Sequence, residues 1–334
     1  MSATMREDDI RPQALLDEFF ARLKRDAERL ATKCRDFVEV PCPICEGERR
    51  DVAFAKEGFT YCQCQACDSL YVTPRPTPQA LAEYASTSEA AEFWSSHFYK
   101  QTAEARRRQI YRPRASLVAD IARQQTPAPS CLVDVGAGYG LFLQEMAALK
   151  LFTPLVAVEP DSRLAPICRE QGFPVVEKWV EDVEEGEIAV DFATAFEVIE
   201  HVFDPRTFLA GCGRLLRPGG MLLLTTLTIS GFDLQVLWEH SRSISPPQHL
   251  NFPSIKGIAR LAERVGFEVV RITTPGQLDI DIVRNRLAAH PELPVPRFAR
   301  ALVQADENTR AEFQSFLQAH CMSSHLHCLA RKPG

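Results

Sequence analysis

The chain has 334 residues, 46% of them hydrophobic and 25% charged, which is ordinary for a globular protein and leaves room for one large domain and a smaller one. No apolar run approaches the roughly 20 residues that cross a bilayer, and residues 1–10 hold no apolar signal region, so we expect a cytoplasmic protein without a membrane partner. Net charge is −6, and residues 1–125 balance 19 basic against 19 acidic side chains, which argues against a nucleic-acid partner.

The first predicted element is an amphipathic helix over residues 12–33. Its apolar side chains recur at helical spacing, and its other face is charged. The helix either packs on its own domain or helps to cover a substrate or contact a second subunit, and the sequence leaves these alternatives open. We assign residues 1–40 to this N-terminal helical segment.

Two C-x-x-C pairs follow, formed by Cys42 with Cys45 and by Cys64 with Cys67, with eighteen residues between them. This spacing in a chain expected to be cytoplasmic is typical of a zinc ribbon with four thiolate ligands. We expect a short β strand leading into the second pair and Cys62 as a spare thiol. Four thiolates leave no open coordination position, so the zinc over residues 41–73 is predicted to be structural.

Residues 74–125 are predicted to form a helical linker or lid. A proline-rich stretch over 73–78 precedes helices at 78–84 and 89–108. The second helix carries an aromatic cluster from Phe93 to Tyr99, which either roofs an active site or packs in a core. The run Arg106–Arg108 is interpreted as a solvated helix face rather than an anion site.

The stretch Cys131–Gly140, C-L-V-D-V-G-A-G-Y-G, organises the rest of the chain. A short apolar run suits a strand buried on both faces, and the glycines at 136, 138 and 140 precede a helical pattern. Strand, glycine turn and helix together form a nucleotide-binding unit. The acid Asp134, just before the first glycine, would repel a pyrophosphate and suits a ligand that carries an ammonium and another positive charge.

Further strands alternate with helices downstream. We expect strands near 131–135, 154–158, 174–177, 190–196 and 220–226, a helix over 254–265 and a strand over 267–273. Such alternation predicts a parallel, doubly wound sheet. Residues 276–323 look helical with proline breaks, and 325–332 alternates as a final strand.

The glycine turn and three later segments resemble the class I S-adenosylmethionine-dependent methyltransferases. The matching segments are the acid with G-x-G-x-G, the strand V-A-V-E-P at 156–160, the segment V-D-F-A-T-A-F-E-V-I-E-H at 190–201, and L-L-R-P-G-G at 215–220. The resemblance implies an α/β fold with a doubly wound, seven-stranded, mostly parallel Rossmann-like sheet over residues 126–334. It also implies that 276–323 is a helical insertion and that the last strand is antiparallel beside the sixth.

The same resemblance assigns the cofactor site. Asp134, Gly136, Ala137, Gly138 and Glu197 would surround the aminoacyl end of S-adenosylmethionine, and Glu159 would accept the ribose hydroxyls. Asp182, or the adjacent Glu181, would accept from the adenine amino group.

Two histidines are candidate catalytic residues. His249 stands in the loop after the fifth strand, which lies over the ligand crevice of such folds, and His201 follows Glu197 and Glu200 at the end of the fourth strand. His249 matches a histidine of nucleotide-sugar C-methyltransferases, but Gln248 and Pro246 replace the acid and the tyrosine of that family's motif.

The whole layout resembles methyltransferases with an N-terminal zinc ribbon, many of which act on sugars. We therefore predict an S-adenosylmethionine-dependent methyltransferase that modifies an oxygen of a small polar acceptor such as a saccharide or nucleotide sugar, with His249 as general base. The alternatives are a sugar C-methyltransferase, an RNA methyltransferase that binds RNA through its ribbon, and a non-enzymatic adaptor.

Overall fold

The computed structural model describes residues 5–334, so the first four residues of the expected 1–40 segment lie outside it. The α-helices are α1 (Glu7–Ile10), α2 (Gln13–Ala31), α3 (Pro78–Thr87), α4 (Glu89–Phe93), α5 (Tyr99–Arg106), α6 (Arg112–Arg123), α7 (Leu141–Leu149), α8 (Ala165–Glu170), α9 (Pro205–Leu215), α10 (Phe232–Leu237), α11 (Ile255–Arg264), α12 (Asp279–Ala289), α13 (Arg297–Gln304) and α14 (Glu307–Ala319). Short π-helical turns at Trp94–Phe98 and Arg107–Tyr111 join α4, α5 and α6.

The strands are β1 (Arg50–Lys56), β2 (Phe59–Cys64), β3 (Leu70–Val72), β4 (Leu132–Val135), β5 (Leu155–Val158), β6 (Val175–Val176), β7 (Val190–Phe196), β8 (Leu216–Leu227), β9 (Asn251–Phe252), β10 (Glu268–Thr273) and β11 (His325–Arg331). Seven of them form one sheet in the order β10-β11-β8-β7-β4-β5-β6. The strands from β4 to β8 pair in parallel, and β11 lies antiparallel between β8 and β10. The doubly wound sheet and its inserted antiparallel strand are thus confirmed.

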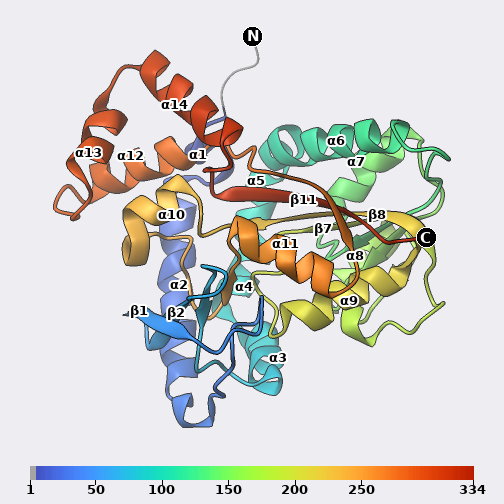
Figure 1. Cartoon of the computed structure of the whole chain (residues 1–334), viewed down its shortest axis with the longest axis horizontal. Helices are drawn as coiled ribbons and strands as arrows, with labels where there is room; N and C mark the ends of the chain where they lie inside the picture. Colours follow the sequence, from blue (N-terminus) through green and yellow to red (C-terminus); the bar gives the residue numbers. More distant parts are fainter. Residues whose placement is uncertain (1–4) are drawn as a thin grey trace.

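Alternating side chains of β4 explain why helices cover both faces of this sheet. Val133 and Val135 pack in one buried cluster with Phe208 of α9 and Leu261 of α11. Leu132 points to the opposite face, into a second cluster with side chains of α6 and α7. Figure 1 shows α6 and α7 on one side of the sheet, and α9 and α11 on the other. A strand buried on both faces reads as continuous apolar sequence, as this one does.

A second, four-stranded sheet has the order β1-β2-β3-β9. The expected strand leading into the second cysteine pair is β2, and β1, which was not expected, pairs with it in a hairpin across Glu57 and Gly58. Both turn residues have positive φ, 50° and 85°, as two-residue hairpin turns require. The fourth strand, β9, comes from the loop before α11, so the sheet contains a segment almost 200 residues downstream.

Helices from both ends of the chain complete the molecule. The buried carboxylate of Asp26 in α2 accepts hydrogen bonds from Ser88 Oγ (2.6 Å) and the Ala90 N–H (3.0 Å), which fixes the start of α4 on α2. Helices α10, α12, α13 and α14 share a separate buried cluster and lie together at one end of the molecule (Figure 1). Over residues 5–334, no helix combines the length and apolarity that crossing a bilayer demands.

Candidate active site

A cavity of about 1050 Å³ opens at the carboxyl ends of the parallel strands. Its walls come from α1 and α2, from α4 to α6, from the loops after β4, β5, β7 and β8, and from α12. This is the crevice in which open α/β sheets bind ligands, and its size suits a nucleotide cofactor together with a small acceptor. Asp134, Gly136, Ala137, Gly138, Asp182, Glu197, His201 and His249 all line it.

The glycine turn after β4 lies against this cavity. Gly136 has φ of +74°, and a Cβ there would come within 2.7 Å of Val198 Cγ2, so the position excludes side chains. Gly138 also has positive φ, but a Cβ there would meet nothing within 4 Å. The space beside Gly138 therefore lets a ligand approach the backbone closely.

Asp134 is 3% exposed, and its Oδ1 accepts a hydrogen bond from Thr194 Oγ1 at 2.6 Å. Burial raises the pKa of this carboxyl to about 7, although the Thr194 bond opposes the shift. A buried carboxylate with one hydroxyl partner has acceptor capacity left for an ammonium group. Asp134 and the open cradle at Gly138 fit the aminoacyl end of S-adenosylmethionine.

Glu159 follows directly after β5, as expected, and contacts the glycine turn. It does not line the cavity, and its two carboxylate oxygens accept the N–H groups of Gly138 (2.7 Å) and Asp161 (3.0 Å). Burial raises its pKa, with these two bonds opposing. Glu159 thus braces the glycine turn, and binding of ribose hydroxyls would use the remaining lone pairs of the same oxygens.

Both acids proposed for the adenine end, Asp182 and Glu181, line the cavity, as does Trp179. Asp161, which the sequence did not single out, lines the same region. Hydrogen bonds from Arg163 outweigh burial and lower the pKa of Asp161, which keeps this carboxylate ionised.

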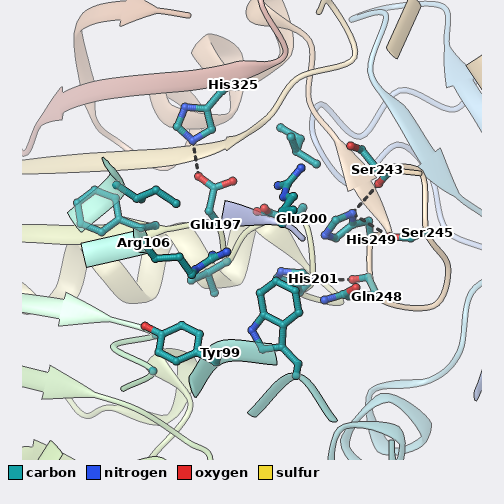
Figure 2. Close-up of a pocket in the computed structure, with 18 of the residues that line it drawn as sticks. Tyr99, Arg106, Glu197, Glu200, His201, Ser243, Ser245, Gln248, His249 and His325 are labelled. Carbon is teal, nitrogen blue, oxygen red and sulfur yellow. Dashed lines mark hydrogen bonds and ion pairs between the residues drawn. The ribbon is translucent and has the colours of Figure 1, made fainter. Parts of the chain in front are cut away.

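Glu197 begins the turn after β7 with a left-handed φ of 56°. Its Oε1 lies 2.7 Å from His325 Nε2 (Figure 2). The same oxygen lies 3.0 Å from Arg114 Nη2 and 2.5 Å from Thr225 Oγ1. Burial would raise the pKa of Glu197, but His325 and Arg114 outweigh it and hold the pKa well below its usual range. Glu197 is therefore an ionised acid whose charge is already compensated by protein groups.

The three partners of Glu197 were not predicted from the sequence; they are Arg114, Thr225 and His325. They come from α6, β8 and β11, and only the placement of β11 beside β8 brings His325 to the end of β7. The spacing of residues within one segment cannot predict a contact between segments that are far apart in the chain.

His201 and His249 lie together, with ring centroids 4.9 Å apart (Figure 2). The Nδ1 atom of His249 is 2.6 Å from the Ser243 carbonyl oxygen, and Nδ1 of His201 is 2.7 Å from the Gln248 carbonyl oxygen. A carbonyl only accepts, so each Nδ1 carries the proton and each Nε2 is left as a lone-pair base. Burial, and then His201, lower the pKa of His249 to about 3, which keeps it neutral across the physiological range.

Glu200 completes this end of the cavity. It is 1% exposed, accepts a hydrogen bond from Thr226 Oγ1 at 2.8 Å, and has a pKa raised well above the usual value by burial and by Glu197. One ligand atom each from Glu200, His201 and His249 lie within 4.8 Å of one another. These three groups could hold a metal ion. However, the positive charge of the Arg11 guanidinium, which contributes to lowering the pKa of His249, disfavours a cation at this position.

The interpretation of Arg106–Arg108 as a solvated face was wrong for two of the three residues. Arg106 lines the cavity, and Arg107 pairs with Gln144 and Glu145 on α7, while Arg108 is exposed. The π-helical turn that begins at Arg107 changes the direction of successive side chains, which a regular helical projection does not anticipate.

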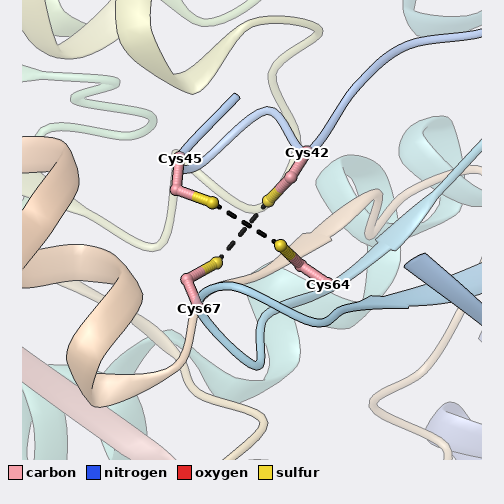
Figure 3. Close-up of side chains that lie close together, drawn as sticks. All are labelled: Cys42, Cys45, Cys64 and Cys67. Carbon is pink, nitrogen blue, oxygen red and sulfur yellow. Dashed lines mark hydrogen bonds between the residues drawn. The ribbon is translucent and has the colours of Figure 1, made fainter. Parts of the chain in front are cut away.

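The four cysteines of the predicted ribbon converge on one point (Figure 3). The Sγ atoms of Cys42 and Cys67 are 3.6 Å apart, those of Cys45 and Cys64 are 3.5 Å apart, and all four lie within 4.8 Å of one another. A tetrahedral zinc with Zn–S bonds of about 2.3 Å needs sulfurs about 3.8 Å apart, so the cluster fits zinc. Cys62 lies outside the cluster, as expected.

Comparison with known proteins gives a family match. The family described as "Methyltransferase domain" matches residues 104–272, just over half of the chain. The match begins in α5 and ends in β10, so it contains the glycine turn, Glu197, His201 and His249, and excludes the ribbon.

Curated relatives match over a shorter range. A ubiquinone biosynthesis O-methyltransferase of Xanthomonas oryzae is 36% identical over 115 residues, which cover 32% of this chain and 47% of the relative. The mitochondrial ubiquinone biosynthesis O-methyltransferase of Homo sapiens is 34% identical over 106 residues, 29% of this chain and 28% of the relative. The chain spans about half or less of the length of these relatives.

Among solved structures, the plantazolicin methyltransferase BpumL in complex with SAH aligns over 77% of this chain and 95% of its own, with 12% identity and a TM-score of 0.49.

Proposed function

The chain belongs to the S-adenosylmethionine-dependent methyltransferases of the methyltransferase-domain family, and on that premise we propose that it methylates a hydroxyl oxygen of a small polar acceptor. When bound, S-adenosylmethionine supplies an electrophilic methyl group on a sulfonium. The observation that carries the proposal is that a neutral imidazole with a free Nε2, on His249, faces the same cavity as the glycine turn and Asp134.

We assign the cofactor end of the cavity to residues already described. Asp134 binds the ammonium of the cofactor, while Gly136, Ala137 and Gly138 form the cradle for its aminoacyl chain. Glu159 orients the turn and offers its remaining lone pairs to the ribose, and Asp182 or Glu181 accepts from the adenine. Glu197 is held by Arg114 and His325, so it provides a fixed negative charge beside the methyl-donor end.

We assign the end of the cavity that is lined by His201 and His249 to the acceptor. His249 accepts the hydroxyl proton through Nε2 while its Nδ1–H remains bonded to Ser243, and His201 holds the neighbouring side of the acceptor. A pKa of about 3 makes His249 a weak base. It acts on a hydroxyl whose proton becomes acidic as the new O–C bond forms, so positioning contributes most of the rate.

Two acceptor classes follow from different observations. The zinc ribbon and the polar side chains around His249 favour a saccharide or nucleotide sugar. The likeness to enzymes named for ubiquinone biosynthesis favours a phenolic hydroxyl instead. Carbon methylation is less supported, since Gln248 offers His201 only its backbone carbonyl where the sugar C-methyltransferases carry an acid.

The test is a mass-spectrometric screen of purified protein with S-adenosylmethionine against nucleotide sugars, simple saccharides and catechols. A gain of one methyl mass on an oxygen of either class supports the proposal and chooses between the two. Methylation of these compounds only on carbon or on nitrogen would contradict it.

The His249→Ala variant tests the base. We expect turnover to fall about 10²- to 10⁴-fold while the affinity for S-adenosylmethionine, measured by calorimetry, stays within about twofold. His320→Ala is the matched control, because His320 is exposed and does not line the cavity. Turnover of His249→Ala within a few-fold of the wild type would remove His249 from this role.

We also propose a division of labour along the chain. Residues 1–40 and 74–125 cover the acceptor, residues 41–73 form the zinc ribbon, and residues 126–334 bind the cofactor, with the insertion 276–323 closing the far wall. The support for this division is that α1, α2, α4, α5 and α12 all contribute side chains to the cavity.

A further inference from the structure

Two arginines from separate N-terminal elements meet at the acceptor end of the cavity. Arg11 follows α1 and Arg106 ends α5, and both line the cavity. Arg106 Nη1 lies 3.5 Å from the carbonyl oxygen of Ile10, the residue next to Arg11. The Arg106 guanidinium also lies over the rings of Trp94 (5.2 Å) and Tyr99 (5.7 Å), and Figure 2 places it between Tyr99 and Glu197.

Neither guanidinium has an anionic partner within residues 5–334. No carboxylate of this part of the chain lies within 4.0 Å of either, and the Arg11 side chain forms no hydrogen bond there. Arg106 Nε is buried and has no hydrogen-bond partner in the part of the chain that the structure describes. Neighbouring arginines behave differently, because Arg107 pairs with Glu145 and Arg114 with Glu197.

The nearby acids do not compensate these two charges. The Glu7 carboxylate accepts from Asn285 Nδ2 at 2.9 Å, and Glu197 is engaged by Arg114 and His325. The Asp233 carboxyl has a pKa raised well above its usual value by burial and by Asp279, so it tends toward the neutral form.

Arg11 itself shows the cost of this arrangement. Burial lowers its pKa and the charge of Arg106 adds to the effect, while Glu7 opposes it. Two like charges at half-buried positions without a counter-ion repel each other, and an oxyanion bound between them would relieve the repulsion and the partial desolvation.

We propose that Arg11 and Arg106 form an oxyanion subsite, so that the acceptor is an acid that carries a carboxylate or a phosphate beside the hydroxyl to be methylated. This inference rests on the proposed function and narrows its substrate class. Guanidinium forks bind both kinds of oxyanion through charge-assisted hydrogen bonds. The rings of Trp94 and Tyr99 hold Arg106 in place for that contact.

The position of the subsite fits the chemistry proposed for His249. The charge of Arg11 is among those that lower the pKa of His249, so the anion would lie close to the base. Neutralising Arg11 with a bound oxyanion would raise that pKa and make His249 a stronger proton acceptor when the acidic acceptor is present.

The test uses full-length protein saturated with S-adenosylhomocysteine and titrated calorimetrically with glucose, glucuronate and glucose 6-phosphate. Acetate and inorganic phosphate are titrated separately to probe the subsite without a sugar. We expect at least one of the two acids to bind about tenfold or more tightly than glucose. The preferred acid, and the matching preference between acetate and phosphate, identifies the anion as carboxylate or phosphate.

The Arg11→Gln and Arg106→Gln variants should each weaken binding of the preferred acid about tenfold or more and leave glucose binding unchanged. Arg106→Lys, which keeps the charge, should restore part of the loss. Arg108→Gln is the matched control, since Arg108 is exposed on the same helical segment and does not line the cavity. Unchanged affinity for S-adenosylhomocysteine in all variants shows that the fold and cofactor site are intact.

Equal affinity for glucose and both acids, no binding of any of the four anions, or loss of cofactor binding in both Gln variants would overturn the subsite. Failure of the proposed function is recognised separately. It would show as no binding of S-adenosylhomocysteine by the wild type, or as methyl transfer to an atom other than oxygen.

Discussion

Asp134 and Glu197 are carboxylates at the same edge of the sheet, and their surroundings move their pKa values in opposite directions. Asp134 has a single hydroxyl partner, and burial raises its pKa to about 7. Glu197 is more exposed, with 32% of its side chain accessible, and it contacts His325 and Arg114, which outweigh burial and hold its pKa well below the usual range. At neutral pH Glu197 is ionised while Asp134 is near its midpoint, so the proposed binding of the cofactor's ammonium by Asp134 would depend on pH.

Asp134→Asn tests this control. The pKa of Asp134 is higher in the folded protein than in the unfolded chain, so ionisation of this carboxyl lowers the stability of the folded protein as pH rises from about 4 to about 7. A bound ammonium group offsets this loss of stability once Asp134 is ionised. We expect wild-type affinity for S-adenosylmethionine to increase about tenfold from pH 6 to pH 8, and the variant to bind more weakly with a flat profile. Calorimetry at three pH values measures both.

The control for this series is Asp120→Asn, an exposed carboxylate on α6. Its profile should follow the wild type. A wild-type affinity that does not change with pH would contradict the assignment of the ammonium to Asp134.

The buried carboxyl of Asp233 in α10 reduces the stability of the folded protein. It is 1% exposed, both of its oxygens lack a hydrogen-bond partner among the described residues, and burial together with Asp279 raises its pKa. Since the folded-state pKa is raised, stability falls as pH rises above about 4. We expect Asp233→Asn to increase the free energy of unfolding by on the order of 1 kcal/mol at pH 8 and to change it little at pH 4.

Asp279→Asn provides the contrast, measured by the same denaturant titrations. Asp279 accepts from the Ser324 N–H (2.8 Å), Ser323 Oγ (2.6 Å) and Gln314 Nε2 (2.8 Å), so its replacement should destabilise the protein at both pH values. If Asp233→Asn destabilised the protein at pH 8 and Asp279→Asn stabilised it, the roles assigned to the two carboxyls would be reversed.

At the scale of elements, the ribbon holds the loop that carries His249. Strand β3 pairs with β9, matching Leu70 with Phe252 and Tyr71 with Asn251, directly after His249. Tyr61 of β2 donates its hydroxyl hydrogen to the His249 carbonyl oxygen at 2.9 Å. The ribbon therefore supports the position of the proposed base although it contributes no ligand to the cavity.

The buried Arg75 extends the same support. It is fully buried, and its guanidinium donates to the Phe203 carbonyl oxygen at 2.7 Å and to Asn251 Oδ1 at 3.0 Å. It thus ties the chain after the ribbon to the turn that follows β7 and to β9. The proline-rich stretch over 73–78 is therefore a fixed structural junction.

Zinc removal tests this coupling. Purified protein should contain about one zinc per chain, and stripping it with a chelator should reduce turnover about tenfold or more while leaving S-adenosylmethionine affinity within about twofold, because β4 and β5 belong to the other sheet. Cys45→Ser should reproduce the loss and Cys62→Ser should not. Full turnover by the zinc-free protein would mean that the loop carrying His249 keeps its position without the zinc-bound ribbon.

At the scale of the whole molecule, the cavity is closed by contacts between the two ends of the chain. Glu7 Oε2 in α1 accepts from Asn285 Nδ2 in α12 at 2.9 Å, and the Glu7 backbone N–H donates to Asp281 Oδ2 at 2.9 Å. Arg11 follows directly after α1. The position of the proposed anion subsite therefore depends on the C-terminal helices.

Asn285→Ala is expected to loosen this closure. It leaves the buried Glu7 carboxylate without its amide partner, so the KM for the acceptor should rise about tenfold while the affinity for S-adenosylmethionine is unchanged. Asn308→Ala on α14, where the residue is exposed, is the control. A change in cofactor affinity without a change in acceptor KM would show that the contact serves the other end of the cavity.

The sequence by itself determined the central sheet, the glycine turn and the zinc ligands. Each is a local pattern, because a strand buried on both faces, a backbone with positive φ and a pair of thiols at C-x-x-C spacing constrain residues that are adjacent in the chain. It also selected His201 and His249, since the ends of parallel strands lie at one edge of such a sheet.

Only the tertiary structure decided which charges meet. His325 reaches Glu197 because β11 inserts beside β8, and Arg11 meets Arg106 because α1 lies against α5. Glu159 turned out to brace the glycine turn, and β9 joined the ribbon sheet from a distant loop. The Glu159 contact spans 21 positions and the others join residues roughly 100 to 200 positions apart. No local propensity encodes these contacts, because their energies depend on burial and partner geometry, which exist only once the chain has folded.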